Sequence, residues 1–196
     1  MGFCFGTGSS SYAIVASPVH SGRYAAAFSV DSRGDAGSQV RCVEDGVFPE
    51  AAYYGAWYYV PTPAVNNGLW NLFHYQGGLP GQTLHGLWDV SLVDVGDAGD
   101  LHISFFDFLA ASVPDVSAVP PIPIAKWFHV EVYFKRAKDA SGELSVWQDG
   151  VLAADLKGLT TDDTDWGQWY VGNLATALSP PVSTVYVDDV TIGSAP

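Results

Sequence analysis

The stretch WFHVEVYFKRAKDASGELSVWQDG, residues 127–150, predicts two β-strands joined by a polar turn. Apolar and polar residues alternate along the first strand, as they do when one face of a strand is buried. The apolar face carries Phe128, Val130, Val132 and Phe134, and the polar face carries His129, Glu131, Tyr133 and Lys135. With the turn centred on Asp139, Lys135 lies opposite Glu143, Tyr133 opposite Ser145, and Glu131 opposite Trp147. This register places Leu144 and Val146 on the apolar face, so the pairing is self-consistent.

The same alternation recurs along the chain. About ten short apolar or alternating segments are separated by turn residues such as Asp-Gly at 45–46 and Asn-Asn-Gly at 66–68. They span residues 24–30, 38–44, 53–60, 69–76, 87–95, 100–108, 127–135, 143–149, 169–175 and 184–192. No segment has a long helical stripe, and 196 residues suit one domain rather than two. We therefore predict a single all-β domain over residues 1–196, an antiparallel two-sheet sandwich in which the proline-rich segment 112–127 crosses between sheets.

The charge and hydropathy of the chain exclude some partners. Eight Lys and Arg residues against 21 Asp and Glu give a formal charge of −13, which argues against binding to nucleic acid. No apolar run is long enough to span a membrane, so no membrane insertion is expected. Few lysines, many Trp and Tyr residues and Gly/Pro-rich loops suggest a secreted or extracellular protein whose leader has been removed. Nothing in the sequence indicates an oligomeric state.

Two cysteines, Cys4 and Cys42, occur in the chain. Their separation fits neither a zinc ribbon nor a redox pair. They form either one disulfide, between the N-terminal segment and an early strand, or two free thiols.

The predicted hairpin also carries a recognisable motif. W-F-H-V-x-V followed by G-x-L-x-V-W-x-D-G, as found between Trp127 and Gly150, resembles the penultimate hairpin of concanavalin A-like lectin and glucanase domains. Residues 185–192 resemble the closing strand of those domains, and residues 17–25 resemble their entry strand. This superfamily includes laminin-G-like modules and jelly-roll polysaccharide lyases. The resemblance implies a jelly roll whose concave sheet binds glycans.

Aromatic residues are more numerous than a core of this size requires, and sugar rings stack on exposed aromatic rings. The surplus consists of Trp57, Tyr59, Trp70, Tyr75, Trp88, Tyr133, Trp147, Trp166 and Trp169. The first functional hypothesis is therefore a lectin-like module that binds a polysaccharide or glycan on the concave face without cleaving it. Its candidate glycan-binding residues are Trp57, Tyr59, His74, Gln76, His129, Tyr133, Lys135 and Trp147. A structural or adhesive module without any glycan ligand is a further possibility.

The alternative is a polysaccharide lyase that cleaves a uronate polymer by β-elimination. Jelly-roll lyases carry motifs resembling R-x-E-L-R, Q-I/V-H and Y-F-K-A-G, and the chain has SQVR at 38–41, HYQ at 74–76 and YFK at 133–135. The resemblance implies Arg41 for carboxylate neutralisation, His74 as base and Tyr133 as acid. The match is incomplete, since Arg41 lacks the preceding Glu-Leu and Leu72 replaces the glutamine before His74.

The distribution of basic residues and the absence of one carboxylate motif favour a lyase over a glycoside hydrolase. Four of the eight basic residues gather at Lys126, Lys135, Arg136 and Lys138, as an anionic polymer would require. The E-x-D-x-x-E motif of retaining glucanases is absent, so a glycoside hydrolase is disfavoured.

A structural calcium ion is implied by the same resemblance. Asp188 and Asp189 are similar to the acidic pair with which many such sandwiches hold calcium against the first loop. Because residues 1–12 contain no acidic side chain, backbone carbonyls or Asp31 and Asp35 would complete the site.

Overall fold

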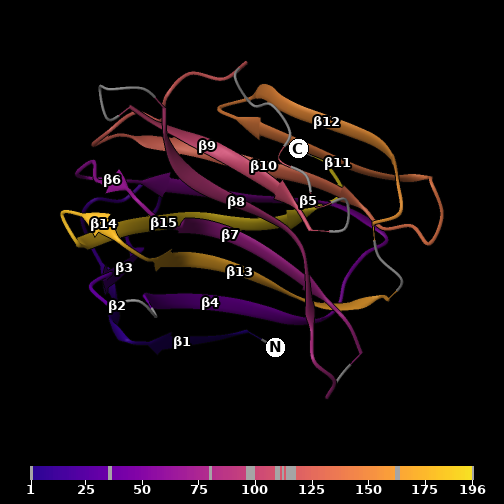
Figure 1. The fold of residues 1–196 in the computed structure, drawn as a ribbon, viewed down its shortest axis with the longest axis horizontal. Helices are drawn as coiled ribbons and strands as arrows, with labels where there is room; N and C mark the ends of the chain where they lie inside the picture. The colour runs from indigo at the N-terminus through magenta and orange to yellow at the C-terminus, as the bar shows by residue number, and fades with distance from the viewer. Residues whose placement is uncertain are drawn as a thin grey trace.

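The structure is a computed structural model that describes residues 2–34, 37–79, 81–95, 100–108, 111, 113, 118–161 and 164–195, with only the backbone of Val95. Two main β-sheets pack face to face across these residues (Figure 1). All strand pairings among the described residues are antiparallel. The predicted all-β jelly-roll sandwich is confirmed. In the part of the chain that is described, there is no helix with the length and apolar character to cross a membrane.

Each sheet draws its strands from both halves of the sequence. The six-stranded sheet has the order β1 (Phe3–Thr7), β4 (Ser38–Val47), β13 (Trp166–Ala175), β7 (Trp70–Gly77), β8 (His85–Val95) and β9 (Asp100–Asp107). The seven-stranded sheet has the order β12 (Val151–Leu159), β11 (Gly142–Gln148), β10 (Trp127–Lys135), β5 (Ala51–Tyr59), β15 (Val182–Gly193), β3 (Ala25–Asp31) and β2 (Ser9–Val15). A small third sheet pairs β14 (Leu178–Ser179) with β6 (Val65–Asn66).

The β10–β11 hairpin forms with the register that its alternation predicts. Glu131 pairs with Trp147, Tyr133 with Ser145 and Lys135 with Glu143. Nζ of Lys135 lies 3.6 Å from Oε1 of Glu143. The register is set by the apolar face, because a slip of one residue would expose every core side chain of the strand.

Large aromatic rings fill the space between the sheets. Phe134 of β10 contacts Tyr75 and Trp88 of the opposite sheet, with ring centroids 5.1 and 5.9 Å apart. Trp70, Trp88 and Trp169 are all buried in this core. Part of the aromatic surplus noted in the sequence therefore packs the interior and is not available to a ligand.

Cys4 and Cys42 are bonded to each other. They lie directly opposite one another in the β1–β4 pair. The disulfide fastens the edge strand β1 to the rest of the six-stranded sheet.

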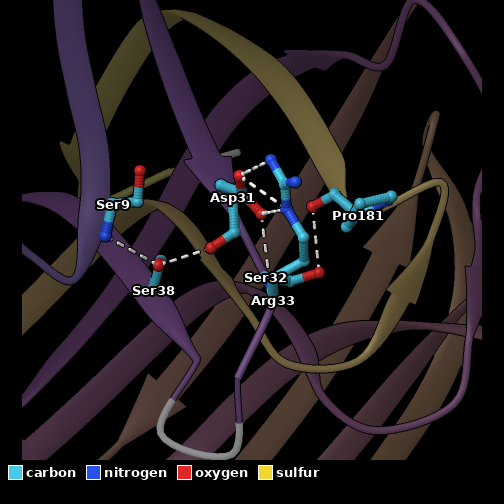
Figure 2. Close-up of polar contacts among 6 residues, drawn as sticks. All are labelled: Ser9, Asp31, Ser32, Arg33, Ser38 and Pro181. Carbon is cyan, nitrogen blue, oxygen red and sulfur yellow. Dashed lines mark hydrogen bonds and ion pairs between the residues drawn. The ribbon is translucent and has the colours of Figure 1, made fainter.

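The chain crosses from one sheet to the other between β3 and β4, and hydrogen bonds hold this corner (Figure 2). The hydroxyl of Ser38 donates to the Asp31 carbonyl at 2.6 Å and accepts from the Ser9 amide at 3.0 Å. The Asp31 carboxylate pairs with the guanidinium of Arg33, and the hydroxyl of Ser32 donates to the carbonyl of Pro181. The two hydrogen bonds of Ser38 tie the start of β4 to β3 and β2.

The proline-rich segment links β9 in one sheet to β10 in the other, as expected. Val119 and Ile122 are buried in the core, and the amide of Ile122 donates to the Leu101 carbonyl at 2.8 Å. Residues 112 and 114–117 lie outside the described part of the chain.

Candidate active site on the six-stranded sheet

Three polar side chains stand side by side on the outer face of the six-stranded sheet. Tyr170 of β13 pairs with His74 of β7, and His74 pairs with Asp89 of β8. The residues on either side of each one belong to the core, for example Trp169 and Val171 beside Tyr170. Alternation therefore turns all three away from the core. The sheet register thus brings together residues that are distant in sequence.

Arg41 of β4 completes this group. It pairs with Gly172 of β13, and its guanidinium carbon lies 5.5 Å from the ring centroid of Tyr170. Gly172 has a φ of +150°, and a Cβ added there would lie 2.4 Å from the carbonyl oxygen of Val40 and 3.3 Å from Cγ of Arg41. A glycine opposite Arg41 therefore gives its side chain room to cross β13.

The positive charge of Arg41 has a neutral partner. Nη2 donates to Oδ1 of Asn71 at 2.7 Å, and among the residues that the structure describes no carboxylate forms an ion pair with Arg41. Burial lowers the pKa of Arg41 to about 10, a shift that Tyr170 and Asp89 oppose. The guanidinium therefore remains protonated at neutral pH, while only 7% of the residue is exposed.

Asn71 holds one orientation because its amide group is enclosed by acceptors. Nδ2 lies 3.2 Å from the Phe73 carbonyl, 3.3 Å from the Val90 carbonyl and 3.2 Å from the hydroxyl of Ser91. These acceptors require the NH2 group on that side, so Oδ1 faces Arg41. Asn71 is thus a positioning residue for the guanidinium.

His74 is a neutral imidazole at physiological pH. Burial, with a contribution from Arg41, lowers the pKa of His74 to about 3. Its ring centroid lies 5.5 Å from that of Tyr170, and the ring of Phe108 approaches edge-on at 5.8 Å. A neutral imidazole keeps one nitrogen lone pair that can accept a proton.

Asp89 faces His74 without forming a hydrogen bond. Its Oδ2 lies 4.0 Å from Nδ1 of His74, which is beyond hydrogen-bonding distance. Burial raises the pKa of Asp89 to about 7, although Arg41 and a hydrogen bond from Ser91 oppose the shift. Because the imidazole is uncharged, the two residues are polar neighbours rather than an ion pair.

The phenol of Tyr170 remains protonated. Its hydroxyl donates to Oε1 of Gln76 at 3.0 Å and also contacts Oε1 of Gln168. Burial raises the pKa of Tyr170, and the nearby Arg41 opposes this shift. The outer face therefore combines a cation, a neutral imidazole and a phenol that can donate a proton.

The structure corrects one member of the predicted catalytic set. Arg41 and His74 come together, but Tyr133 lies on β10 in the opposite sheet, where it pairs with Tyr53. The expectation that Arg41, His74 and Tyr133 converge is wrong, because the two sheets of a sandwich expose opposite faces. Tyr170 takes the place beside them.

The predicted glycan-binding residues are likewise divided between the two sheets. His74 and Gln76 lie on β7 of the six-stranded sheet. Strands β5, β10 and β11 of the seven-stranded sheet carry the others, which are Trp57, Tyr59, His129, Tyr133, Lys135 and Trp147. A single binding face that includes all eight is therefore excluded, and their roles in binding stay predictions.

Sequence reasoning missed Tyr170, Gln168, Asp89 and Asn71. The alternation of the predicted strand 169–175 did indicate that Tyr170 faces away from the core, because it stands between the apolar residues Trp169 and Val171. The parity places Tyr170 outside the core, but only the strand order reveals its neighbours.

The acidic pair on β15, Asp188 and Asp189, holds the loop between β2 and β3 directly. Oδ2 of Asp188 accepts from the backbone amide of His20 at 2.9 Å and from that of Ser21 at 3.2 Å. Asp189 binds the His20 ring and the Ser21 hydroxyl, both at 2.7 Å. The carboxylates are thus occupied by hydrogen-bond donors, and the N–H groups among these donors cannot ligate a cation, which requires oxygen ligands. Among the described residues no group of three or more His, Cys, Asp and Glu could hold a metal ion.

The two additional calcium ligands do not complete the site either. Asp31 pairs with Arg33 and lies opposite Val182, six residues along β15 from Asp188, or about 20 Å. Asp35 is outside the described residues. The calcium ion stays a prediction from the resemblance alone.

Comparison with solved structures identifies proteins of similar fold. An endo-β-1,4-glucuronan lyase from the fungus Trichoderma reesei aligns with a TM-score of 0.76 at 14% identity, over 98% of this chain and 90% of that one. A family 7 alginate lyase variant in complex with product aligns with a TM-score of 0.62 at 9% identity, over 86% and 79%. A carbohydrate esterase from the Shiga toxin-encoding bacteriophage phi24B aligns with a TM-score of 0.62 at 12% identity, over 96% and 88%.

These similarities define the class of fold, a jelly-roll sandwich of the kind found in polysaccharide lyases. No protein-family model matches the sequence, and no curated protein matches it.

Proposed function

We propose that this protein is a polysaccharide lyase that cleaves a uronate-containing polymer by β-elimination. The observation that carries the proposal is the charge of Arg41, which is buried beside His74 and Tyr170 with a neutral hydrogen-bond partner. A buried cation that forms no ion pair is costly, and an anionic ligand offsets that cost. The carboxylate of a uronate residue is such an anion.

Arg41 would bind the uronate carboxylate and stabilise the negative charge that develops on it. Removal of the C5 proton places electron density on the adjacent carboxylate, so a fixed cation there lowers the barrier. Guanidinium groups suit this role because their planar N–H groups match both carboxylate oxygens. Asn71 holds the group in place.

His74 and Tyr170 would perform the two proton transfers. The neutral imidazole accepts the C5 proton, and the electron pair of the C5–H bond forms the C4–C5 double bond. The bond between C4 and the glycosidic oxygen breaks, and the phenol of Tyr170 donates its proton to the leaving oxygen. Water then restores both residues. The low pKa of His74 and the raised pKa of Tyr170 favour this assignment over the reverse.

The comparisons support the substrate class, because the similar structures include lyases of glucuronan and of alginate, which are uronate polymers. The Cys4–Cys42 disulfide supports an extracellular location, because disulfides persist in oxidising compartments.

The test is ultraviolet absorbance of the unsaturated product during incubation with glucuronan, alginate, pectate and heparin-like polymers. The expected result is product from at least one polymer with the wild type, and a loss of at least 100-fold in Tyr170→Phe. Tyr133→Phe is the matched control, since the same hydroxyl is removed on the opposite sheet, and it should keep full activity. Binding of these polymers without product would instead favour the lectin-like module.

A further inference from the structure

The outer face of the seven-stranded sheet carries an aromatic cluster, on the opposite sheet from Arg41, His74 and Tyr170. We propose that it binds neutral sugar residues of a polysaccharide, in a hollow lined by Tyr53, Tyr133 and Trp147. This binding site is independent of the catalytic proposal, because it involves none of the same residues and lies on the other sheet.

Three adjacent strands supply the rings. Tyr53 of β5 and Tyr133 of β10 are directly paired, with centroids 4.9 Å apart, and Trp147 of β11 lies 6.0 Å from Tyr53. The Tyr53 ring is inclined at 44° to the Tyr133 ring and at 40° to the Trp147 ring, so these rings do not stack flat on one another. All three are half-buried, so each presents part of its surface to the hollow. Rigid aromatic surfaces of this kind pack against the C–H faces of sugars.

The polar residues around the rings can bind hydroxyl groups. Glu143, Ser145, Asp155 and Lys157 line the same hollow. The hydroxyl of Ser145 donates to Asp155 at 2.7 Å, and Nζ of Lys157 lies 3.2 Å from the same carboxylate. Carboxylate oxygens are strong acceptors for hydroxyl groups. Such a rim, together with an aromatic floor, suits a sugar.

The charge balance selects a neutral sugar over a uronate. Glu143 is paired with Lys135 at 3.6 Å, and Asp155 is paired with Lys157, so the two carboxylates and two ammonium groups cancel. An acidic sugar would meet these carboxylates without an unpaired cation to offset the repulsion. This differs from the opposite sheet, where Arg41 has no carboxylate pair among the described residues.

Trp57 on the same sheet provides the contrast. His20 stacks on its ring at 3.7 Å and an angle of 14°, and His129 stacks at 5.1 Å and 25°. The neighbouring histidines therefore occupy the ring surfaces of Trp57. Because it is half-buried like Trp147 but covered by these rings, Trp57 is the matched control.

A neutral-sugar site on the opposite sheet would hold the protein on a mixed polysaccharide while the Arg41 face acts on uronate chains. The two sheet faces would then bind different sugars independently, so loss of neutral-sugar binding on one face should not change uronate binding on the other.

The test is affinity gel electrophoresis with soluble neutral polymers, namely hydroxyethyl cellulose, xyloglucan and laminarin, each at several concentrations. We expect at least one polymer to retard the wild type, and Trp147→Ala and Tyr53→Ala to weaken that binding at least tenfold. Trp57→Ala should bind as the wild type does. Thermal unfolding of each variant checks that it is folded. If either Trp147→Ala or Tyr53→Ala fails to fold, the other variant still tests the site.

Three results would overturn the inference. One is the absence of retardation by all three neutral polymers. Another is equal weakening in Trp57→Ala and Trp147→Ala, which would place the binding elsewhere on the sheet. The third is loss of retardation by glucuronan or alginate in Trp147→Ala, which would contradict the charge argument. None of these results depends on whether the protein has lyase activity.

Discussion

Arg41 on β4 reaches across Gly172 of β13 and donates a hydrogen bond to Asn71 on β7. Three strands that are far apart in sequence thus present one cation on the outer face of the six-stranded sheet. Because the hydrogen-bond partner is neutral, Arg41 forms no ion pair with a carboxylate among the residues that the structure describes. Four predictions follow from this relationship and its neighbours.

Replacement of Arg41 by Gln should abolish lyase activity. The charge that stabilises the developing anion is lost, and removal of such a group typically costs about 100- to 1,000-fold in kcat. Rates of product formation on the best uronate polymer provide the measurement. Arg33→Gln is the control, since Arg33 is exposed and paired with Asp31. Near-normal turnover in Arg41→Gln would contradict the proposed mechanism.

Replacement of Asn71 by Asp should weaken substrate binding by the folded protein. The substitution keeps the shape of the side chain but places a carboxylate 2.7 Å from the guanidinium, which cancels the free charge. We expect KM for the uronate polymer to rise at least tenfold, and the Tm to fall, because the second carboxylate oxygen would face the Phe73 and Val90 carbonyls that now accept from Nδ2. Ser104→Asp on the edge strand β9 adds the same charge farther from Arg41 and should change KM far less. Equal effects of the two substitutions would show that only net charge matters.

Gly172→Ala should destabilise the fold and displace Arg41. The added Cβ would lie 2.4 Å from the carbonyl oxygen of Val40, and the backbone there has a φ of +150°. Steric conflict with backbone atoms costs about 1–3 kcal/mol. Urea unfolding measures the change, and Gly22→Ala is the control because its φ is also positive while nothing lies within 4 Å of its added Cβ. A smaller loss in Gly172→Ala than in Gly22→Ala would refute the steric explanation.

The pH dependence of stability should report on Asp89. Its folded pKa is raised from 3.8 to about 7, so the contribution of Asp89 to stability is fully present below pH 3.8 and is lost as pH rises through 7. The isosteric Asp89→Asn variant cannot ionise and should gain stability relative to the wild type between pH 5 and pH 8. Chemical denaturation at several pH values measures this difference. A difference that is constant over that interval would mean that Asp89 has an ordinary pKa.

Local pattern accounts for much of the fold. Alternation in residues 127–135 and 143–149 predicted the β10–β11 hairpin, and a turn centred on Asp139 predicted its register, with which the side-chain parity agrees. The short strands and turns elsewhere likewise predicted a sandwich. For the candidate site, alternation could place Arg41, His74 and Tyr170 on strands, but it carries no information about which strands become neighbours.

Sequence by itself therefore determined most of the strands, their buried faces and the hairpin register, since these depend on contacts between residues close along the chain. It missed the strands β1, β2 and β12. Only the tertiary structure decided that Tyr170, and not Tyr133, joins Arg41 and His74. The order of strands within the two sheets arises from packing between distant segments. A tyrosine on the wrong sheet has the same local pattern as a tyrosine on the right one, and the core between the sheets separates them.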